Sequence, residues 1–322
     1  MSSFDALDGV PYPAPGMTEA VVPAATPLAR GSLGAPEWAR ELVGVQSGSD
    51  VASSEFRCVE GERFALVSVC IPTAAMMDAD GLRHAVRDAY LRLAEAIADR
   101  NAHQLVRVWN FIPGILEPLG TLEHRYMAFN AGRHDAYAAL FGGGRRFATA
   151  VPTASGVGHD GDELLIHALA SVEAGEPVEN PRQVPSYRYS IRYGPLPPSF
   201  ARATRIRPRA DEQWLLVGGT ASVRGEETVH VGDLEAQADE TLDNLAAVVA
   251  AAPGGVRGTH RADLLGRYRH LRVYHVSDGD RDWVGGWVTS CFAGVEKVEL
   301  ARADLCRDGL LVEVEGVAEL GA

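Results

Sequence analysis

Two glutamates close to the C-terminus, Glu313 and Glu315, lie in the segment LLVEVEGVA, where apolar and polar residues partly alternate. Residues two apart in a β-strand share a face, so both carboxyls point the same way, with Leu311 and Val317 beside them. One interpretation is an edge strand with a wet face. The other is that one glutamate is semi-buried, keeps its proton near neutral pH because desolvation disfavours the anion, and serves as a general acid.

Arginines and tyrosines recur together in the middle of the chain. The arginines are Arg133, Arg188, Arg192 and Arg202, and the interleaved tyrosines are Tyr126, Tyr187, Tyr189 and Tyr193. Most arginines in a protein serve surface solubility, but a guanidinium fork also holds a carboxylate bidentately, and a tyrosine adds a hydroxyl donor beside an apolar ring. Such a lining suits a dicarboxylate that carries a six-membered ring.

Three glycines, Gly156, Gly158 and Gly161, match the pattern GxGxxG literally. A dinucleotide site needs a strand before this pattern and a helix after it, whose N-terminus meets the pyrophosphate. The order of elements expected here places a strand next. We therefore interpret these residues as a plain glycine loop.

Two acidic groups could be imagined as metal ligands: Glu226 and Glu227 with His230, and Asp160 with Asp162. Neither has a recognised ligand spacing, and acidic clusters in loops are usually solvated. No GxSxG elbow and no helical His pair are present. We expect no metal ion and no organic cofactor.

The composition is that of a globular protein, with 322 residues, 46% of them hydrophobic and 23% charged. The net charge of −13 argues against nucleic-acid binding, and no apolar stretch approaches the 20 residues of a membrane span. The N-terminal 30 residues lack an uninterrupted apolar region, and the four cysteines form no CxxC pair: Cys58, Cys70, Cys291 and Cys306. We expect a cytoplasmic protein with free thiols.

The elements that must position these residues follow the order β-α-β-α-β-β twice. In the first copy we expect strands at 64–71, 105–112, 148–151 and 164–169, and helices after Asp78 or Asp80 and at 126–141. In the second we expect strands at 214–221, 271–276, 295–300 and 310–317, a helix capped by Asp233 and another at 283–291. The fold class is therefore α/β (α+β), with two tandem units.

We divide the chain into an N-terminal arm or small subdomain at 1–56, a central domain at 57–185 and a C-terminal domain at 186–322. A connector rich in Pro, Tyr and Arg occupies roughly 179–209. Long irregular loops in compact proteins are usually functional or disordered, and this one carries too many aromatic residues for a spacer.

The C-terminal unit resembles the Rid (YjgF-type) family in its strand ending in GG, the helix QADETLDNLAAVV, and the segments LRVYHV and LLVEVEGVA. Longer strings between about 57 and 318 resemble a narrower family, the chorismatases. In chain order these strings are RVWNFIPGI, YMAFNAGRHDAY, PTASGVG, ENPRQVPSYRYS, YGPLPPSFARAT and LLVGGTASVRGEETVHVGDL.

The chorismatase resemblance implies a monomer of pseudo-threefold Rid-like layout, with chorismate bound in a cleft between the central and C-terminal units. The family's proton donor is a glutamate on the last strand, which falls on Glu313. Matching positions place around the substrate Tyr126, Arg133, Tyr187 and Arg202, to which we add Tyr193 from the connector.

Two positions sort the chorismatases by product. The hydrolytic type has alanine after the first glycine of the GG-like strand end, whereas the 3-hydroxybenzoate type has glycine there and a cysteine seven residues before the glutamate. This chain has Gly219 and Cys306. The resemblance thus implies that chorismate becomes 3-hydroxybenzoate and pyruvate, a typical step of secondary metabolite biosynthesis.

Three alternatives remain. One is a hydrolytic chorismatase that gives pyruvate and trans-3,4-dihydroxycyclohexa-1,5-diene carboxylate. Another is a Rid-type imine deaminase, against which Lys297 counts, because it stands where the Rid family has an arginine and lysine is a poorer bidentate clamp. The third is a metabolite-binding protein without catalytic activity.

Overall fold

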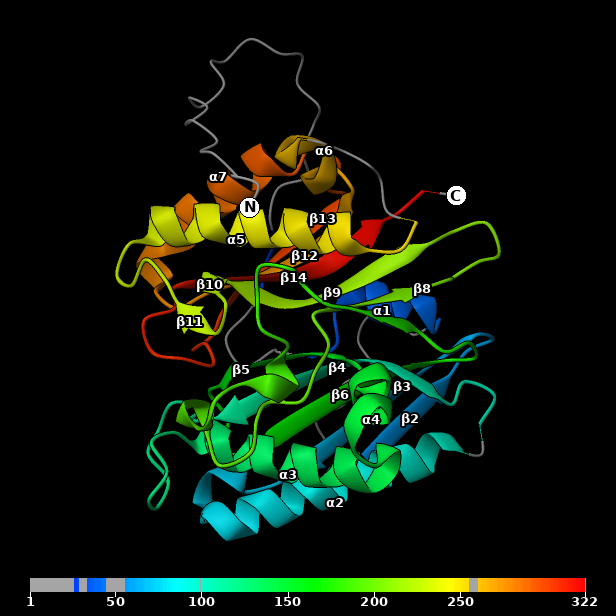
Figure 1. The fold of residues 1–322 in the computed structure, drawn as a ribbon, viewed down its shortest axis with the longest axis vertical. Helices are drawn as coiled ribbons and strands as arrows, with labels where there is room; N and C mark the ends of the chain where they lie inside the picture. The colour runs from blue at the N-terminus through cyan, green and yellow to red at the C-terminus, as the bar shows by residue number, and fades with distance from the viewer. Residues whose placement is uncertain (1–25, 29–33, 45–55, 99, 255–259, 322) are drawn as a thin grey trace.

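The computed structural model describes residues 26–28, 34–44, 56–98, 100–254 and 260–321. Two β-sheets lie face to face at the centre of the molecule, and helices cover the outer face of each (Figure 1). The predicted fold class, α/β units in tandem, is confirmed.

The first sheet has five strands in the order β2-β3-β6-β4-β5. They are β2 (Phe56–Glu60), β3 (Phe64–Ile71), β6 (Leu164–Ser171), β4 (Gln104–Pro113) and β5 (Thr153–His159). Only the β4–β5 pairing is parallel. Two helices, α2 (Ala79–Ala98) and α3 (Arg125–Phe141), cover its outer face. Asp78 caps α2, because its Oδ1 accepts the Gly81 N–H at 2.8 Å.

The second sheet has seven strands in the order β1-β13-β12-β14-β9-β8-β7. They are β1 (Thr26–Pro27), β13 (Lys297–Arg302), β12 (Tyr268–His275), β14 (Val312–Glu319), β9 (Trp214–Ala221), β8 (Ala203–Ile206) and β7 (Glu176–Val178). Its outer face carries α5 (Leu234–Ala251), α6 (Arg261–Leu265) and α7 (Arg281–Cys291). The predicted cap of α5 is confirmed, since Asp233 accepts the Ala236 N–H at 3.0 Å.

Strand β14, which carries both glutamates, lies in the middle of this sheet and pairs antiparallel with β12 and β9. The interpretation of this segment as an edge strand is therefore wrong. Val312 and Val314 pack toward the outer helices, while Val317 packs between the two sheets. The glutamates share the face of Val317, as the alternation in the sequence predicted, and the structure turns this face toward the other sheet.

Apolar side chains from both sheets form a third core between them, into which the short helix α1 (Glu37–Leu42) inserts Trp38. The Trp38 ring meets the ring of Trp109 edge-on, with centroids 5.6 Å apart. The described part of the arm thus adds one strand, β1, and one helix to the two α/β units. The two sheets are joined by this core as one body of close-packed side chains.

The structure differs from the sequence-based expectations at two places. The strand expected at 148–151 is wrong, because those residues end helix α4 (Gly144–Ala150), and Pro152 then drives Val151 into the extended region at ψ 127°. The chain also changes sheets between Ser171 and Glu176, before the domain boundary that we placed at 185. No helix in the described ranges is long and apolar enough to cross a membrane.

Candidate active site

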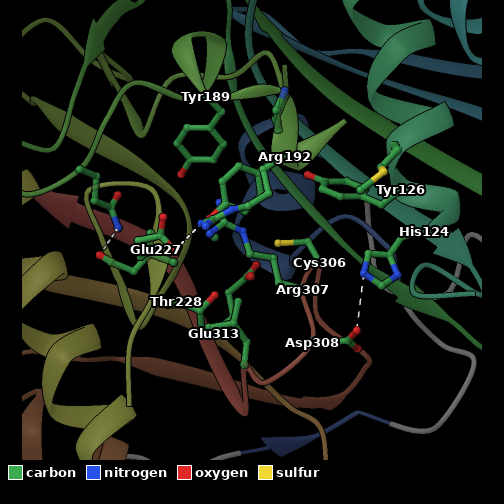
Figure 2. Close-up of a pocket in the computed structure, with 18 of the residues that line it drawn as sticks. His124, Tyr126, Tyr189, Arg192, Glu227, Thr228, Cys306, Arg307, Asp308 and Glu313 are labelled. Carbon is green, nitrogen blue, oxygen red and sulfur yellow. Dashed lines mark hydrogen bonds and ion pairs between the residues drawn. The ribbon is translucent and has the colours of Figure 1, made fainter. Parts of the chain in front are cut away.

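A cavity of about 320 Å³ opens where the two units meet. Its walls come from the start of α3, the connector, β9, the loop before β14 and the small hairpin of β10 (Val223–Arg224) and β11 (Glu227–Thr228). Of the residues that the sequence predicted, the cavity brings together Tyr126, Tyr193, Arg202, Gly219, Cys306 and Glu313. Figure 2 shows the side chains of Tyr126, Cys306 and Glu313 around it.

The Glu313 carboxyl lies in the wall of this cavity, and the residue is 4% exposed. No hydrogen bond of the described residues reaches its side chain, so its proton is not committed to a protein acceptor. Burial, together with the negative charge of Glu315, raises its pKa from 4.5 to about 8 against the opposing effect of three nearby arginines. Glu313 is therefore a protonated acid at neutral pH.

Glu315, two residues along the same strand, has the opposite environment although it is only 2% exposed. Its carboxylate accepts hydrogen bonds from the Arg107 guanidinium at 2.7 Å, Trp109 Nε1 at 3.0 Å, the Tyr274 hydroxyl at 3.2 Å and the Ser155 hydroxyl. Four donors compensate an anion that burial alone would disfavour. One face of β14 thus holds one ionised and one protonated carboxyl.

Gly219 of β9 lies directly against the Glu313 carboxyl. A Cβ atom added at this glycine would stand 2.0 Å from Glu313 Oε1 and 2.7 Å from its Cδ. The absence of a side chain at 219 therefore sets the position of the acid. The Gly219 N–H donates to Ser155 Oγ at 2.9 Å, which fixes this part of β9.

Two arginines, the buried Arg202 and the half-buried Arg307, line the cavity without a carboxylate partner among the described residues. Arg202 donates to the Val184 carbonyl at 3.0 Å and to the Tyr189 hydroxyl at 2.5 Å. Arg307 donates to the Glu226 carbonyl at 2.6 Å and stacks on Tyr193, its guanidinium carbon 4.1 Å from the ring centroid. Two unneutralised cations in a partly apolar cavity favour a dianionic ligand.

Sequence reasoning missed Arg307. It lies outside the Tyr/Arg-rich connector, in the loop before β14, and reaches the connector only through the fold. The available signal was its place directly after Cys306, a residue already singled out.

The outer rim of the cavity is closed by contacts between the connector and the β10–β11 hairpin. Arg192 forms an ion pair with Glu227 (Figure 2). The Tyr193 hydroxyl donates to the Glu226 carbonyl. The Glu226 carboxylate accepts the Ser190 N–H at 2.9 Å. Glu226 and Glu227, which were considered above as possible metal ligands, therefore pair with the connector. In the described ranges, no three His, Cys, Asp or Glu side chains are grouped as metal ligands.

Two of the predicted substrate contacts do not line the cavity. Arg133 is buried behind it on α3, where it donates to Asn130 Oδ1 at 2.9 Å and lies against the Tyr126 hydroxyl. Tyr187 lines a separate depression beside His134 and Phe147. Arg133 therefore contacts the cavity wall from behind, through Tyr126 and through the ring of Phe200, 5.7 Å from its guanidinium carbon.

Cys306 lines the cavity next to Glu313. Burial raises the pKa of the Cys306 thiol to about 12, so it stays neutral beside the Glu313 carboxyl.

Gly156 and Gly158 belong to β5, and the next element is the strand β6, as predicted. An added Cβ at Gly156 would stand 3.2 Å from the Tyr126 ring, so this glycine makes room for Tyr126.

Comparisons with known proteins agree with this geometry. A family model described as chorismatase FkbO/Hyg5-like, N-terminal, matches residues 43–170. A 3-hydroxybenzoate synthase from Streptomyces hygroscopicus is 33% identical over 262 residues, which cover 80% of this chain and 74% of that protein. A chorismatase from Streptomyces rapamycinicus is 36% identical over 243 residues, which cover 74% of this chain and 71% of that protein.

A solved structure agrees as well. The crystal structure of a chorismatase superposes with a TM-score of 0.70 at 27% identity, covering 85% of this chain and 79% of that one. Sequence identity above 30% to relatives that are matched over more than two thirds of their length, together with this superposition, assigns the family. The chain belongs to the chorismatase family.

Proposed function

We propose that this enzyme converts chorismate into 3-hydroxybenzoate and pyruvate, with Glu313 as the general acid. The observation that carries the proposal is a buried carboxyl without a hydrogen-bond partner, in a cavity that also holds two cations without carboxylate partners. An enol ether is activated by protonation at carbon, which needs an acid that is still protonated at neutral pH.

Arg202 and Arg307 hold the two carboxylates of the substrate in this proposal, since they are the cations that line the cavity without an anionic partner among the described residues. Tyr126 and Tyr193 flank the ring. Arg133, first expected to touch the substrate, supports the Tyr126 hydroxyl instead. The site binds a dianion although the chain carries a net charge of −13, because the local charge and not the total decides binding.

The reaction begins when Glu313 transfers its proton to the methylene carbon of the enolpyruvyl group, which gives an oxocarbenium ion beside the new carboxylate. The neighbouring ring hydroxyl then attacks the ring carbon that bears the ether and loses its proton to Glu313. The ring C–O bond breaks, and its electron pair completes the carbonyl of pyruvate. The arene oxide left behind opens and loses a ring proton to give 3-hydroxybenzoate. No water is consumed, and the acid is restored.

The choice of product follows from two neighbours of the acid. Cys306 brings a neutral thiol to the cavity wall, where an attacking water would otherwise stand. Gly219 lets the Glu313 carboxyl lie against β9, which leaves room for the ring pose that the internal displacement needs. Both residues favour the intramolecular route over hydrolysis to the dihydrodiol.

A Rid-type deaminase is not favoured by the geometry. The Lys297 ammonium, at the position of the Rid arginine, pairs with Glu37 of α1 at 2.5 Å and does not line the cavity. It is therefore not placed to clamp the carboxylate of an imino acid in this site.

The test is incubation of the purified protein and of Glu313→Gln with chorismate, followed by pyruvate detection and mass spectrometry of the aromatic product. We expect 3-hydroxybenzoate and pyruvate in equal amounts, and a loss of turnover of roughly a hundredfold or more in the variant, because glutamine keeps the shape but has no acidic proton. Turnover close to that of the wild type in the variant would remove Glu313 from this role. Binding of chorismate without pyruvate would indicate a binding protein.

A further inference from the structure

The four donors to Glu315 come from three strands that surround β14. Arg107 and Trp109 belong to β4, Ser155 to β5 and Tyr274 to β12. Arg107 is 1% exposed and forms its ion pair with Glu315. The carboxylate is therefore held at a fixed place and cannot leave it without unpairing a buried guanidinium.

This cluster is connected directly to the position of Glu313. Ser155 donates to Glu315 and accepts the N–H of Gly219, the glycine against which the Glu313 carboxyl lies. The strand itself makes the second connection, because residues 313 and 315 are on the same face. A displacement of the Glu315 carboxylate would therefore also displace Glu313, through the shared strand and through the Ser155–Gly219 hydrogen bond to β9.

The charged and titratable groups around Glu313 are the cations Arg107, Arg202 and Arg307, the anion Glu315, and the neutral groups Cys306, Tyr126 and Tyr274. Three guanidiniums would draw the proton off a carboxyl in this setting. Burial is the largest cause that keeps the proton on Glu313, and among the charged groups Glu315 is the one that acts in the same direction. Without it, the cations that bind the substrate would lower the pKa of Glu313 further and favour its ionised form.

We propose that Glu315 is a positioning residue for the reaction, whose fixed carboxylate offsets the guanidiniums around Glu313 and so keeps the catalytic proton in place. The inference rests on the proposed function of Glu313 as an acid. It explains why an ion pair is buried between the two sheets next to the cavity, where apolar residues would pack at lower cost.

The test compares the pH dependence of Glu313 in the wild type and in Glu315→Gln. The variant removes the anion and leaves Arg107 unpaired, so we expect the alkaline limb of kcat/KM to move to lower pH by one unit or more. Activity at pH 8 then falls by about fivefold or more relative to the wild type, approaching tenfold at higher pH, while activity at pH 5 stays within a few-fold. Glu315→Asp keeps the charge and should keep the limb in place.

A matched control is available in the same sheet. Glu299 on β13 is 7% exposed and pairs with Arg272 at 2.8 Å, and neither is among the groups that shift Glu313. Because Arg272 lies opposite Glu315 on β12, the control variant replaces both members of the pair, as Arg272→Met with Glu299→Gln, so that no unpaired cation is left beside Glu315. This double variant removes a buried ion pair of the same sheet and should leave the alkaline limb of kcat/KM unmoved. An equal displacement in both variants would mean that lost packing causes it, and would overturn the proposal.

The double variant Arg107→Met, Glu315→Gln covers the case in which Glu315→Gln does not fold, because removing both charges of a buried pair is better tolerated than removing one. With both charges gone, we expect the alkaline limb of kcat/KM to lie within about half a pH unit of its wild-type position. If Glu315 had no influence, the loss of Arg107 alone would move the limb to higher pH, and that result would refute the inference.

Titration of the Glu313 carboxyl carbon by ¹³C NMR in substrate-free protein, assigned by difference from Glu313→Gln, separates this inference from the proposed function. A midpoint that falls in Glu315→Gln supports the role of Glu315 even if chorismate is not converted. If chorismate is converted but the Glu313 midpoint is the same in Glu315→Gln as in the wild type, the proposed function stands and the proposed role of Glu315 is refuted.

Discussion

Replacing Gly219 by alanine perturbs the acid itself. The new Cβ would stand 2.0 Å from Glu313 Oε1, whereas ordinary contacts begin near 3.4 Å, so the carboxyl must move by at least about 1.4 Å. Gly219 does not have a positive φ, and alanine fits its backbone. The effect of the substitution therefore comes from the displaced carboxyl and not from backbone strain.

We expect two consequences of this displacement. A misplacement of about 1 Å at the reacting group costs up to about a hundredfold in rate, so kcat of Gly219→Ala should fall by one to two orders of magnitude. Combined with Cys306→Ala, which vacates space beside the acid, the shifted carboxyl should admit water to the oxocarbenium ion. The product of the double variant should then shift from 3-hydroxybenzoate toward the dihydroxycyclohexadiene carboxylate.

The assay is liquid chromatography with mass spectrometry on the products of pure chorismate, since the dihydrodiol is heavier than 3-hydroxybenzoate by one water. Gly286→Ala on α7 is the control, because an added Cβ there meets nothing within 4 Å, and its rate and product should be unchanged. Unchanged 3-hydroxybenzoate at an unchanged rate from the double variant would refute the assignment of both residues.

The remaining predictions concern charge and pH. Since burial raises the pKa of Glu313 to about 8, wild-type kcat/KM should fall tenfold per unit above that pH, measured by pyruvate release. Because the folded-state pKa of Glu313 lies above its unfolded value, the wild type loses stability as pH rises from 4.5 to about 8. Glu313→Gln does not bear this loss, so its stability relative to the wild type should increase over this range by up to about 5 kcal/mol. Urea unfolding at pH 5 and pH 9 measures the difference. Arg307→Gln should raise KM for chorismate about 10- to 100-fold, because a charge-assisted hydrogen bond is lost; an unchanged KM would exclude Arg307 as a carboxylate ligand.

Much of the fold was predictable because its signals are local. The helix after Asp78, the cap at Asp233 and the strand at 64–71 depend on neighbours within a few residues, and each agrees with the structure. The end of α4 was missed because short apolar runs do not distinguish strand from helix, and Pro152 was the local cue that settled it.

The candidate site was only partly predictable, for a physical reason that Arg133 and Arg307 illustrate. Arg133 stands in a motif typical of the family, yet α3 turns it behind Tyr126. Arg307 carries no motif of its own and reaches the cavity through stacking on tyrosines more than 110 residues away in the chain. Which arginine faces a cavity depends on how two sheets pack, and no local pattern encodes this.

The sequence alone determined the tandem α/β units, the shared face of Glu313 and Glu315, and the residues that match the chorismatases at 219 and 306. Only the tertiary structure decided which of the two glutamates is ionised, because that depends on donors from β4, β5 and β12 that surround Glu315 and leave Glu313 without a partner. Alternation along a strand fixes where a side chain points, whereas its protonation is fixed by the dielectric and the charges that the rest of the chain brings to it.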